Sequence, residues 1–161
     1  MWPSIALLAF VTLQRLAELL VSRANARRLL EAGGHEVASG HYPLIVAVHV
    51  AWLIMLWWLA PERPINLPFF ILFAIIEVCR AWVLWTLGRR WTTRIIVVPG
   101  ETLVASGPYR FVNHPNYLVV AAEVAVLPLV FGLWQVALLF SALNAAVLAV
   151  RIRAENRALG R

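Results

Sequence analysis

The sequence contains no lysine and no aspartate, so a single residue type carries each sign of charge. Fourteen arginines and eight glutamates give a formal net charge of +6. The arginines are scattered among apolar and aromatic segments, so they fit determinants of membrane topology better than a nucleic-acid surface, and we expect no nucleic-acid partner. The single cysteine, Cys79, lies in an apolar segment and cannot form a disulfide framework.

Several catalytic signatures are also missing. There is no G-x-G-x-x-G fingerprint, no glycine-rich phosphate loop, no H-E-x-x-H and no cysteine pair. The four histidines are spaced too widely to place two on one helical turn, as a helical zinc site requires: His35, His41, His49 and His114. The sequence therefore predicts no metal site and no Rossmann domain.

The composition is that of an integral membrane protein. Hydrophobic residues make up 62% of the chain, charged residues only 14%, and the mean hydropathy is +0.79. Backbone polar groups must pair internally in hydrocarbon, and the long apolar runs show no period-2 alternation, so helices are the expected spanning elements. We predict an all-α, polytopic fold in which residues 1–161 form a single domain.

Four apolar segments are long enough to cross a bilayer: 4–22, 41–60, 67–88 and 118–150. The last would give roughly 50 Å of helix, which is too long for one crossing. Gly132, with Pro128 four residues earlier, predicts a turn near 131–134 and a C-terminal hairpin of two helices of about 15 residues each. The prediction is five spans, at about 4–22, 41–60, 67–88, 117–131 and 133–150, with a cofactor loop at 89–116 and a cytoplasmic tail at 151–161.

The arginines support this topology under the positive-inside rule. With the N-terminus outside, eleven arginines fall in the predicted inner loops and tail: Arg23, Arg27, Arg28, Arg89, Arg90, Arg94, Arg110, Arg151, Arg153, Arg157 and Arg161. Only Arg63 falls in an outer link. The polar loop and the C-terminus are therefore expected on the cytoplasmic side.

Two pairs of opposite charge stand three residues apart inside the predicted spans, Arg15 with Glu18 and Glu77 with Arg80. Ionisable residues in spans are costly and usually pair or face a cavity. The spacing of both pairs favours neutralised structural charge over a role in substrate binding.

Glu123 has no partner nearby in the sequence. It must pair across helices or face a cavity, and the sequence leaves both possibilities open. His49 is expected to be a satisfied hydrogen-bonding residue, although it could also be the partner that Glu123 needs.

The densest polar cluster, Ser106 to Tyr117, reads SGPYRFVNHPNY and directly precedes the last apolar run. Pro108 and Pro115 fix turns and bias the residues before them away from the α region, so the segment should wrap as a loop. A wrapped loop of this composition beside a span indicates a site at the membrane surface.

Three elements in this order resemble the isoprenylcysteine carboxyl methyltransferase family. They are Thr102-Leu103-Val104 with Ser106-Gly107-Pro108-Tyr109, then His114-Pro115-Asn116-Tyr117, then Arg151-x-x-x-Glu155 with Leu159 beyond the hairpin. The related phospholipid methyltransferases share the His-Pro-x-Tyr element and the acidic tail motif. The resemblance covers about residues 101–159.

The resemblance implies an S-adenosylmethionine-dependent membrane methyltransferase. Matched residue by residue, it implies a cofactor pocket formed by Leu103, Val104, Tyr109, His114, Pro115, Tyr117 and Glu155. It directs Arg151 toward the substrate. The chain departs from the family pattern at Asn113, where arginine is usual before His-Pro, and at Asn156, where a second glutamate is common.

These residue types also suit the cofactor on physical grounds. S-Adenosylmethionine carries a sulfonium, an ammonium and a carboxylate, which call for aromatic faces, an anion and a hydrogen-bond donor. Glu155 can accept from the ammonium or the ribose hydroxyls, and His114 can donate to the carboxylate. Tyr109 or Tyr117 can lie against the sulfonium by cation–π attraction.

The sequence indicates the methyl acceptor less directly than it indicates the cofactor. Methyl transfer needs orientation more than acid–base chemistry, and a cation such as Arg151 suits a carboxylate or an acidic hydroxyl. An amine acceptor would prefer a carboxylate, for which Glu123 is the only candidate without a local partner, so we name Arg151 and Glu123 as catalytic candidates. We predict methylation at oxygen of a lipophilic or prenylated acceptor taken from the membrane lipid phase. The alternatives are a phospholipid N-methyltransferase and a non-enzymatic scaffold or small transporter.

The chain is also similar to the small bacterial members of the family, through its short N-terminal half and its Asn-His-Pro-Asn-Tyr sequence. That similarity implies O-methylation of alkylpyrones or alkylresorcinols. It further implies a multi-pass protein of the bacterial inner membrane whose active site faces the cytoplasm. The tryptophans Trp52, Trp57, Trp58, Trp82 and Trp85 fit either an apolar tunnel or an interfacial belt.

Overall fold

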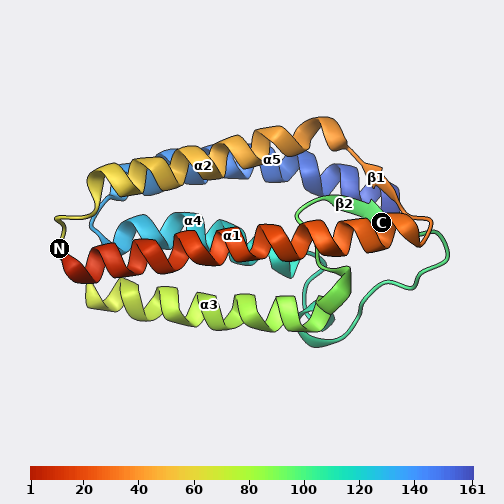
Figure 1. The fold of residues 1–161 in the computed structure, drawn as a ribbon, viewed down its shortest axis with the longest axis horizontal. Helices are drawn as coiled ribbons and strands as arrows, with labels where there is room; N and C mark the ends of the chain where they lie inside the picture. The colour runs from red at the N-terminus through yellow and green to blue at the C-terminus, as the bar shows by residue number, and fades with distance from the viewer.

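The computed structural model describes residues 1–161 as an elongated bundle of five α-helices (Figure 1). They are α1 Trp2–Glu31, α2 Tyr42–Leu59, α3 Leu67–Leu87, α4 Pro115–Val130 and α5 Trp134–Leu159. Four of them are long and apolar enough to cross a membrane, and α4 is a shorter apolar helix. The all-α, polytopic prediction is confirmed, and there is no Rossmann-like sheet.

Prolines mark the beginnings of these helices. Pro3, Pro43, Pro68 and Pro115 occupy the first turns of α1, α2, α3 and α4. A proline is favoured there because its missing N–H would have no intrahelical partner. The local sequence thus fixes where four of the five helices begin.

The predicted hairpin turn is confirmed. Helix α4 ends at Val130, Gly132 adopts a left-handed φ of 70°, and α5 begins at Trp134. The N–H of Leu133 donates to the carbonyl of Pro128 at 2.9 Å, which closes the turn. Helix α4 has the expected length at 16 residues, whereas α5 has 26 because it continues through most of the segment predicted as a separate tail.

Helix α1 is also longer than predicted. It runs 30 residues to Glu31, well past the expected end near Ser22, and carries Arg23, Arg27 and Arg28 on its final turns. These turns reach the end of the bundle where β1, β2 and the C-terminus lie (Figure 1).

A two-stranded antiparallel sheet, absent from the prediction, joins the two long connections. Strand β1 (His35–Val37) pairs with β2 (Ile95–Val97), with His35 opposite Val97. Short 3-10 helices follow at η1 (Ser39–His41), η2 (Gly88–Arg90) and η3 (Gly107–Arg110). The predicted 89–116 loop therefore contains regular structure.

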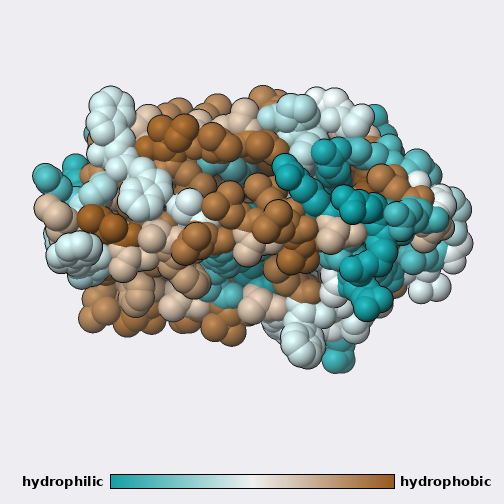
Figure 2. Space-filling view, in the orientation of Figure 1, coloured by the Kyte–Doolittle hydropathy of each residue, from teal (hydrophilic) through white to brown (hydrophobic).

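The apolar core and the polar connections lie at opposite ends of the bundle. Core residues near the N-terminal end include Leu8, Leu56, Leu127 and Phe131, all at most 1% exposed. Figure 2 shows apolar side chains along the middle of the molecule and a polar surface over the end that carries the sheet. The packed end holds the helices together, which leaves the other end to form cavities.

Candidate active site

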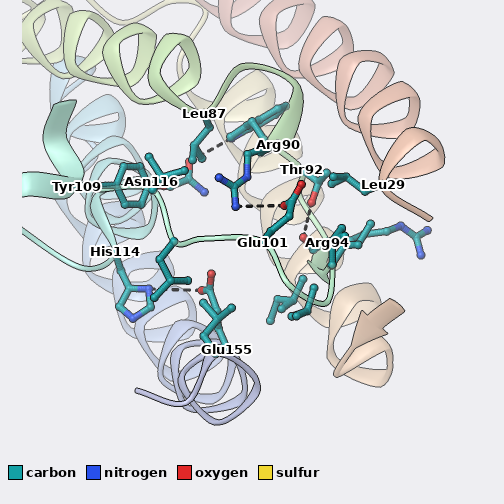
Figure 3. A pocket seen from close by; sticks show the side chains of 18 of the residues that line it. Leu29, Leu87, Arg90, Thr92, Arg94, Glu101, Tyr109, His114, Asn116 and Glu155 are labelled. Carbon is teal, nitrogen blue, oxygen red and sulfur yellow. Dashed lines mark hydrogen bonds and ion pairs between the residues drawn. The ribbon is translucent and has the colours of Figure 1, made fainter. Parts of the chain in front are cut away.

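A cavity of about 180 Å³, here called the loop cavity, lies at the polar end between the 89–116 connection and the ends of α4 and α5. Six of the seven predicted cofactor residues line it: Leu103, Val104, Tyr109, His114, Tyr117 and Glu155. Figure 3 labels three of them, Tyr109, His114 and Glu155. The seventh, Pro115, is buried in the first turn of α4 and does not line the cavity. Pro115 instead begins α4, the helix that carries Tyr117.

His114 lies at the start of α4 and approaches two side chains of α5. Its Nε2–H donates to Oδ1 of Asn156 at 2.8 Å, and its Nδ1 lies 3.4 Å from Oε2 of Glu155. The His114 and Tyr117 rings are tilted against each other with centroids 5.6 Å apart. Asn156, one of the two departures from the family pattern, therefore orients the histidine.

The carboxylate of Glu155 has unused hydrogen-bonding capacity. Its Oε2 is buried and accepts no hydrogen bond from any protein group. A buried acceptor without a donor is unfavourable, so this oxygen is suited to a ligand that brings a donor.

Tyr109 faces the same cavity as a neutral phenol. Burial, aided by the negative charge of Glu155, raises the pKa of Tyr109 to about 12. Its hydroxyl therefore keeps its proton and can donate a hydrogen bond throughout the physiological pH range.

Two arginines shape the wall of the loop cavity. Arg90 donates to the carbonyl of Thr102 at 2.7 Å and lies 3.2 Å from Oε2 of Glu101 (Figure 3). Arg161 donates to the carbonyl of Asn113 at 3.2 Å. The second departure from the family pattern, Asn113, thus lines the cavity and anchors the C-terminus.

A second cavity of about 240 Å³, here called the helix cavity, extends from the first toward the middle of the bundle. Much of its wall is apolar, from residues of α1, α2 and α4 such as Leu16, Leu19, Ile45, Val50, Leu53 and Val120. Both volumes far exceed the ~10–15 Å³ that one water molecule needs. The two cavities share Trp91, Asn116 and Tyr117, here called the neck, and Trp91 Nε1 donates to Asn116 Oδ1 at 3.4 Å.

Arg151 lies on the helix-cavity side of the neck. It is 5% exposed, its Nη2 donates to the carbonyl of Thr93 at 2.7 Å, and its guanidinium carbon lies 5.8 Å from the centre of the Tyr117 ring. Arg151 takes part in none of the ion pairs of the chain. A buried cation without a carboxylate partner is suited to an anionic ligand.

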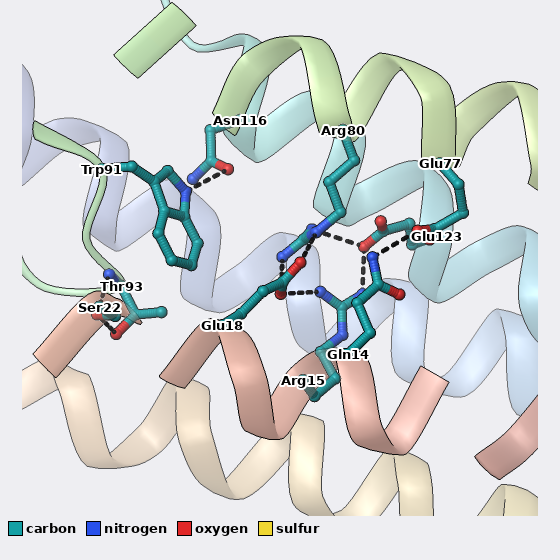
Figure 4. A network of polar contacts seen from close by, with 10 residues as sticks. All are labelled: Gln14, Arg15, Glu18, Ser22, Glu77, Arg80, Trp91, Thr93, Asn116 and Glu123. Carbon is teal, nitrogen blue, oxygen red and sulfur yellow. Dashed lines mark hydrogen bonds and ion pairs between the residues drawn. The ribbon is translucent and has the colours of Figure 1, made fainter. Parts of the chain in front are cut away.

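Four charged residues form a network in the middle of the bundle (Figure 4). Arg80 donates through Nε and Nη2 to both oxygens of Glu18, each at 2.6 Å, and through Nη1 to Glu123 at 2.9 Å. Arg15 pairs with Glu18 at 3.0 Å, as predicted, and also with Glu123. The network joins α1, α3 and α4.

The contacts of this network contradict the predicted Glu77–Arg80 pair and answer the question that the sequence left open for Glu123. Arg80 pairs with Glu18 and Glu123, so the predicted Glu77–Arg80 pair was wrong, and Glu77 instead accepts from Gln14 at 2.6 Å. Glu123 pairs across helices, is fully buried and lines neither cavity. The carboxylate that an amine acceptor would need is therefore already engaged.

His49 is hydrogen-bonded as expected, with Nδ1 2.9 Å from the carbonyl of Ile45, and it is not the partner of Glu123. Of the five tryptophans considered for a tunnel, only Trp52 lines either of these two cavities. Trp58 and Trp85 are 78% and 89% exposed, which fits the lipid or interfacial surface.

Sequence reasoning missed Trp91 and Thr93. Neither belongs to a recognisable motif. Trp91 forms part of the neck, and Thr93 lies beside it, only because the connection after α3 folds back across α1. Asn116 could have been identified, because it lies inside the His-Pro-Asn-Tyr element. No group of three or more His, Cys, Asp or Glu side chains could hold a metal ion.

Comparison with known proteins decides the family. The model of the isoprenylcysteine carboxyl methyltransferase (ICMT) family matches residues 69–161, more than half of the chain. The chain belongs to this family. It is also 37% identical over 166 residues to the uncharacterized protein YpbQ of Bacillus subtilis (strain 168), with 95% of this chain and 94% of the relative covered. No solved structure matches.

Family membership and the apolar helices establish an integral membrane methyltransferase of the isoprenylcysteine type. The matched region contains the loop cavity motifs, the neck residues, Arg151 and Glu155. It begins after α1 and α2, so both helices that form much of the helix-cavity wall lie outside it.

Proposed function

We propose that this protein transfers the methyl group of S-adenosylmethionine to an oxygen of a lipophilic acceptor. The single observation that carries the proposal is the pair of neighbouring cavities that share the neck residues as a common wall. One contains Glu155, whose buried Oε2 accepts no hydrogen bond although it lies 3.4 Å from His114 Nδ1, and the other contains Arg151, which belongs to no ion pair.

The loop cavity fits the cofactor by the chemistry of its side chains. Glu155 Oε2 can accept from the ammonium or the ribose hydroxyls, and the Tyr109 hydroxyl can donate to the carboxylate. The faces of Tyr117 and His114 offer aromatic surface to the sulfonium. His114 is held by Asn156 and lies beside Glu155, so this side of the cavity is organised before any ligand binds.

The helix cavity fits the acceptor. Its apolar wall suits an alkyl or prenyl chain, and Arg151 at the neck suits a carboxylate, enolate or phenolate oxygen. Long-chain acidic hydroxyl compounds such as alkylpyrones or alkylresorcinols combine both properties, and so do prenylcysteine carboxylates.

When bound, S-adenosylmethionine would supply a methyl group on a cationic sulfur for in-line displacement, in which the bond to the acceptor oxygen forms as the carbon–sulfur bond breaks and the neutral thioether leaves. Arg151 holds that oxygen as an anion near the neck, and Tyr117 lies between the guanidinium and the loop cavity. Trp91 and Asn116 narrow the passage and limit water at the transfer point. Orientation and desolvation then supply most of the rate.

The arginine distribution supports an inner-membrane protein of bacteria whose loop cavity faces the cytoplasm, where the cofactor is available. Eleven arginines lie in the final turns of α1, in the connection after α3 or at the end of α5, the same end of the bundle as the loop cavity.

Calorimetry with S-adenosylmethionine on the purified, detergent-solubilised protein tests the cofactor half of the proposal. The wild type should bind, and Glu155→Gln should weaken binding by about 10-fold to 100-fold, because it removes a charge-assisted hydrogen bond of about 1.5–3 kcal/mol. The matched control is Glu62→Gln, an exposed glutamate between α2 and α3. Absence of binding heat at millimolar cofactor would overturn the proposal.

A further inference from the structure

Polar side chains line the helix cavity at two depths along the bundle. Methyl transfer at the neck accounts for the polar side chains at one depth but not for those at the other. Ser22 of α1 and Tyr42 of α2 both hydrogen-bond to Thr93 Oγ1, at 2.8 and 2.9 Å. Thr93 also accepts from Arg151 through its carbonyl. These contacts place Ser22 of α1 and Tyr42 of α2 beside the neck.

A second polar zone lies further along the same two antiparallel helices. Arg15 precedes Ser22 by seven residues, and His49 follows Tyr42 by seven residues. Seven residues span about two helical turns, or ~10 Å, so Arg15 and His49 lie at a similar depth on the side away from the neck. Both line the helix cavity, as does Trp52 one turn beyond His49.

Each of these three side chains has a polar atom without a protein partner. Arg15 Nε and Trp52 Nε1 are buried and donate to no protein group. The Nδ1–H of His49 donates to the carbonyl of Ile45 in its own helix, so Nε2 of the neutral ring has a lone pair that can accept a hydrogen bond, and the ring lies edge-on to Trp52 at 6.3 Å between centroids. We call these residues the inner polar zone.

Burying unpaired donors inside a membrane bundle is unfavourable, because hydrocarbon offers no alternative partner. A plain alkyl or prenyl chain would fill the cavity and leave all three atoms unpaired. A hydroxyl at this depth can accept from Arg15 Nε or Trp52 Nε1 and donate its hydrogen to His49 Nε2.

The charge balance indicates a neutral oxygen. The network contains two arginines and two glutamates, and each arginine of the network is already paired with both glutamates. A second anion on the acceptor would therefore have no unbalanced cation to meet at this depth, whereas a carbonyl or hydroxyl needs only a donor.

We propose that the inner polar zone binds a second, uncharged oxygen of the acceptor, about two helical turns from the oxygen that is methylated. The inference rests on the proposed function and narrows its acceptor. The acceptor class is an elongated amphiphile whose chain or ring system carries a hydroxyl in addition to the acidic oxygen at the neck.

The test compares two long-chain alkylresorcinols of equal length, one with a plain chain and one with a chain hydroxyl about 10 Å from the phenol oxygen. Labelled methyl transfer gives kcat/KM for each. The wild type should prefer the compound with the chain hydroxyl about tenfold, the value of one net hydrogen bond. Trp52→Phe and His49→Phe should each reduce that ratio toward one.

Trp58→Phe is the matched control, since Trp58 lies on the same helix but is 78% exposed and outside the cavity. It should keep the wild-type ratio. Cofactor binding by calorimetry should be unchanged in all three variants, which shows that they fold.

Equal rates with both compounds in the wild type, or a ratio unchanged in both cavity variants, would overturn this inference while leaving the proposed function intact. Absence of product from either compound, with cofactor bound, would overturn the acceptor assignment and this inference together.

Discussion

In the proposed function, the specificity for an oxygen acceptor depends on Arg151. It is buried, it belongs to no ion pair, and it lies beside the neck. Arg151→Gln should lower kcat/KM for an acidic acceptor by about 10²–10³, a typical effect of losing one donor to a reacting oxygen, and leave cofactor affinity within about twofold. Arg153→Gln, exposed on the same helix, is the control, and the readout is labelled methyl transfer.

A different result would assign Arg151 to cofactor binding and not to acceptor binding. If Arg151→Gln weakened cofactor binding as strongly as it lowered turnover, the guanidinium would serve the loop cavity and the acceptor would need another anion partner.

Tyr109 provides a test of the electrostatics in the loop cavity. Burial and Glu155 raise its pKa to about 12, so the folded protein keeps the phenol protonated while the unfolded chain ionises near pH 10. The contribution of Tyr109 to the free energy of unfolding should be constant below pH 10 and fall as the pH rises toward 12.

Ultraviolet difference titration of the wild type against Tyr109→Phe should therefore give a tyrosinate midpoint about two units above the ordinary value. A midpoint near pH 10 would show that the phenol is hydrated, and the cavity geometry would then be wrong at this wall.

At the scale of elements, the sequence predicted what depends on local signals. Gly132 after Pro128 marked the hairpin turn, and prolines mark the beginnings of four helices. The ends of α1 and α5 were missed because the final turns of both are polar and rich in arginine, and hydropathy identifies a span, not the extent of a helix.

The small sheet could not be predicted for a different reason. Strands β1 and β2 have three residues each, too few to show alternation, and their pairing brings together segments 58 to 62 residues apart. Arg94 of the loop reinforces it by pairing with Glu36 at 3.0 Å and lying 4.5 Å above the ring of Tyr42.

Gly107 controls how the η3 turn packs on α3. Its φ is +56°, and a Cβ at this position would overlap the side chain of Thr86. Gly107→Ala should therefore lower the free energy of unfolding by about 1–3 kcal/mol and weaken cofactor binding, since Tyr109 follows two residues later. Gly40→Ala is the control, because a Cβ there meets open space. Equal thermal stability of the two variants in detergent would contradict this packing.

At the scale of the whole molecule, the charge network connects the helices that surround the site. Its pairs span 43 to 108 residues of sequence except for Arg15–Glu18. Spacing within one helix predicted that local pair correctly and the Glu77–Arg80 pair wrongly. Long-range partners depend on how α1, α3 and α4 pack, which periodicity does not reveal.

Removing one member of this network should be costly. Glu123→Leu leaves Arg15 and Arg80 to share Glu18 in a buried setting, so we expect a loss of about 3–5 kcal/mol in the free energy of unfolding. Thermal unfolding in detergent followed by circular dichroism measures it, with Glu62→Leu as the exposed control. A loss below 1 kcal/mol would show that the network does not hold these helices together.

The loop-cavity residues were predictable because the resemblance to the family is carried by short motifs at fixed spacing. The helix cavity was not, because α1 and α2 contribute much of its wall and lie outside the matched region. Under the proposed function, acceptor specificity is therefore encoded in part of the chain that the family motifs do not cover.

The most direct test of the proposed function is transfer of labelled methyl from S-adenosylmethionine by the purified wild-type protein. The panel contains a farnesylcysteine analogue, an alkylpyrone, an alkylresorcinol and phosphatidylethanolamine. We predict label in at least one of the three acidic oxygen acceptors and none in phosphatidylethanolamine. Label in phosphatidylethanolamine alone, or no label in any acceptor at saturating cofactor, would contradict the account.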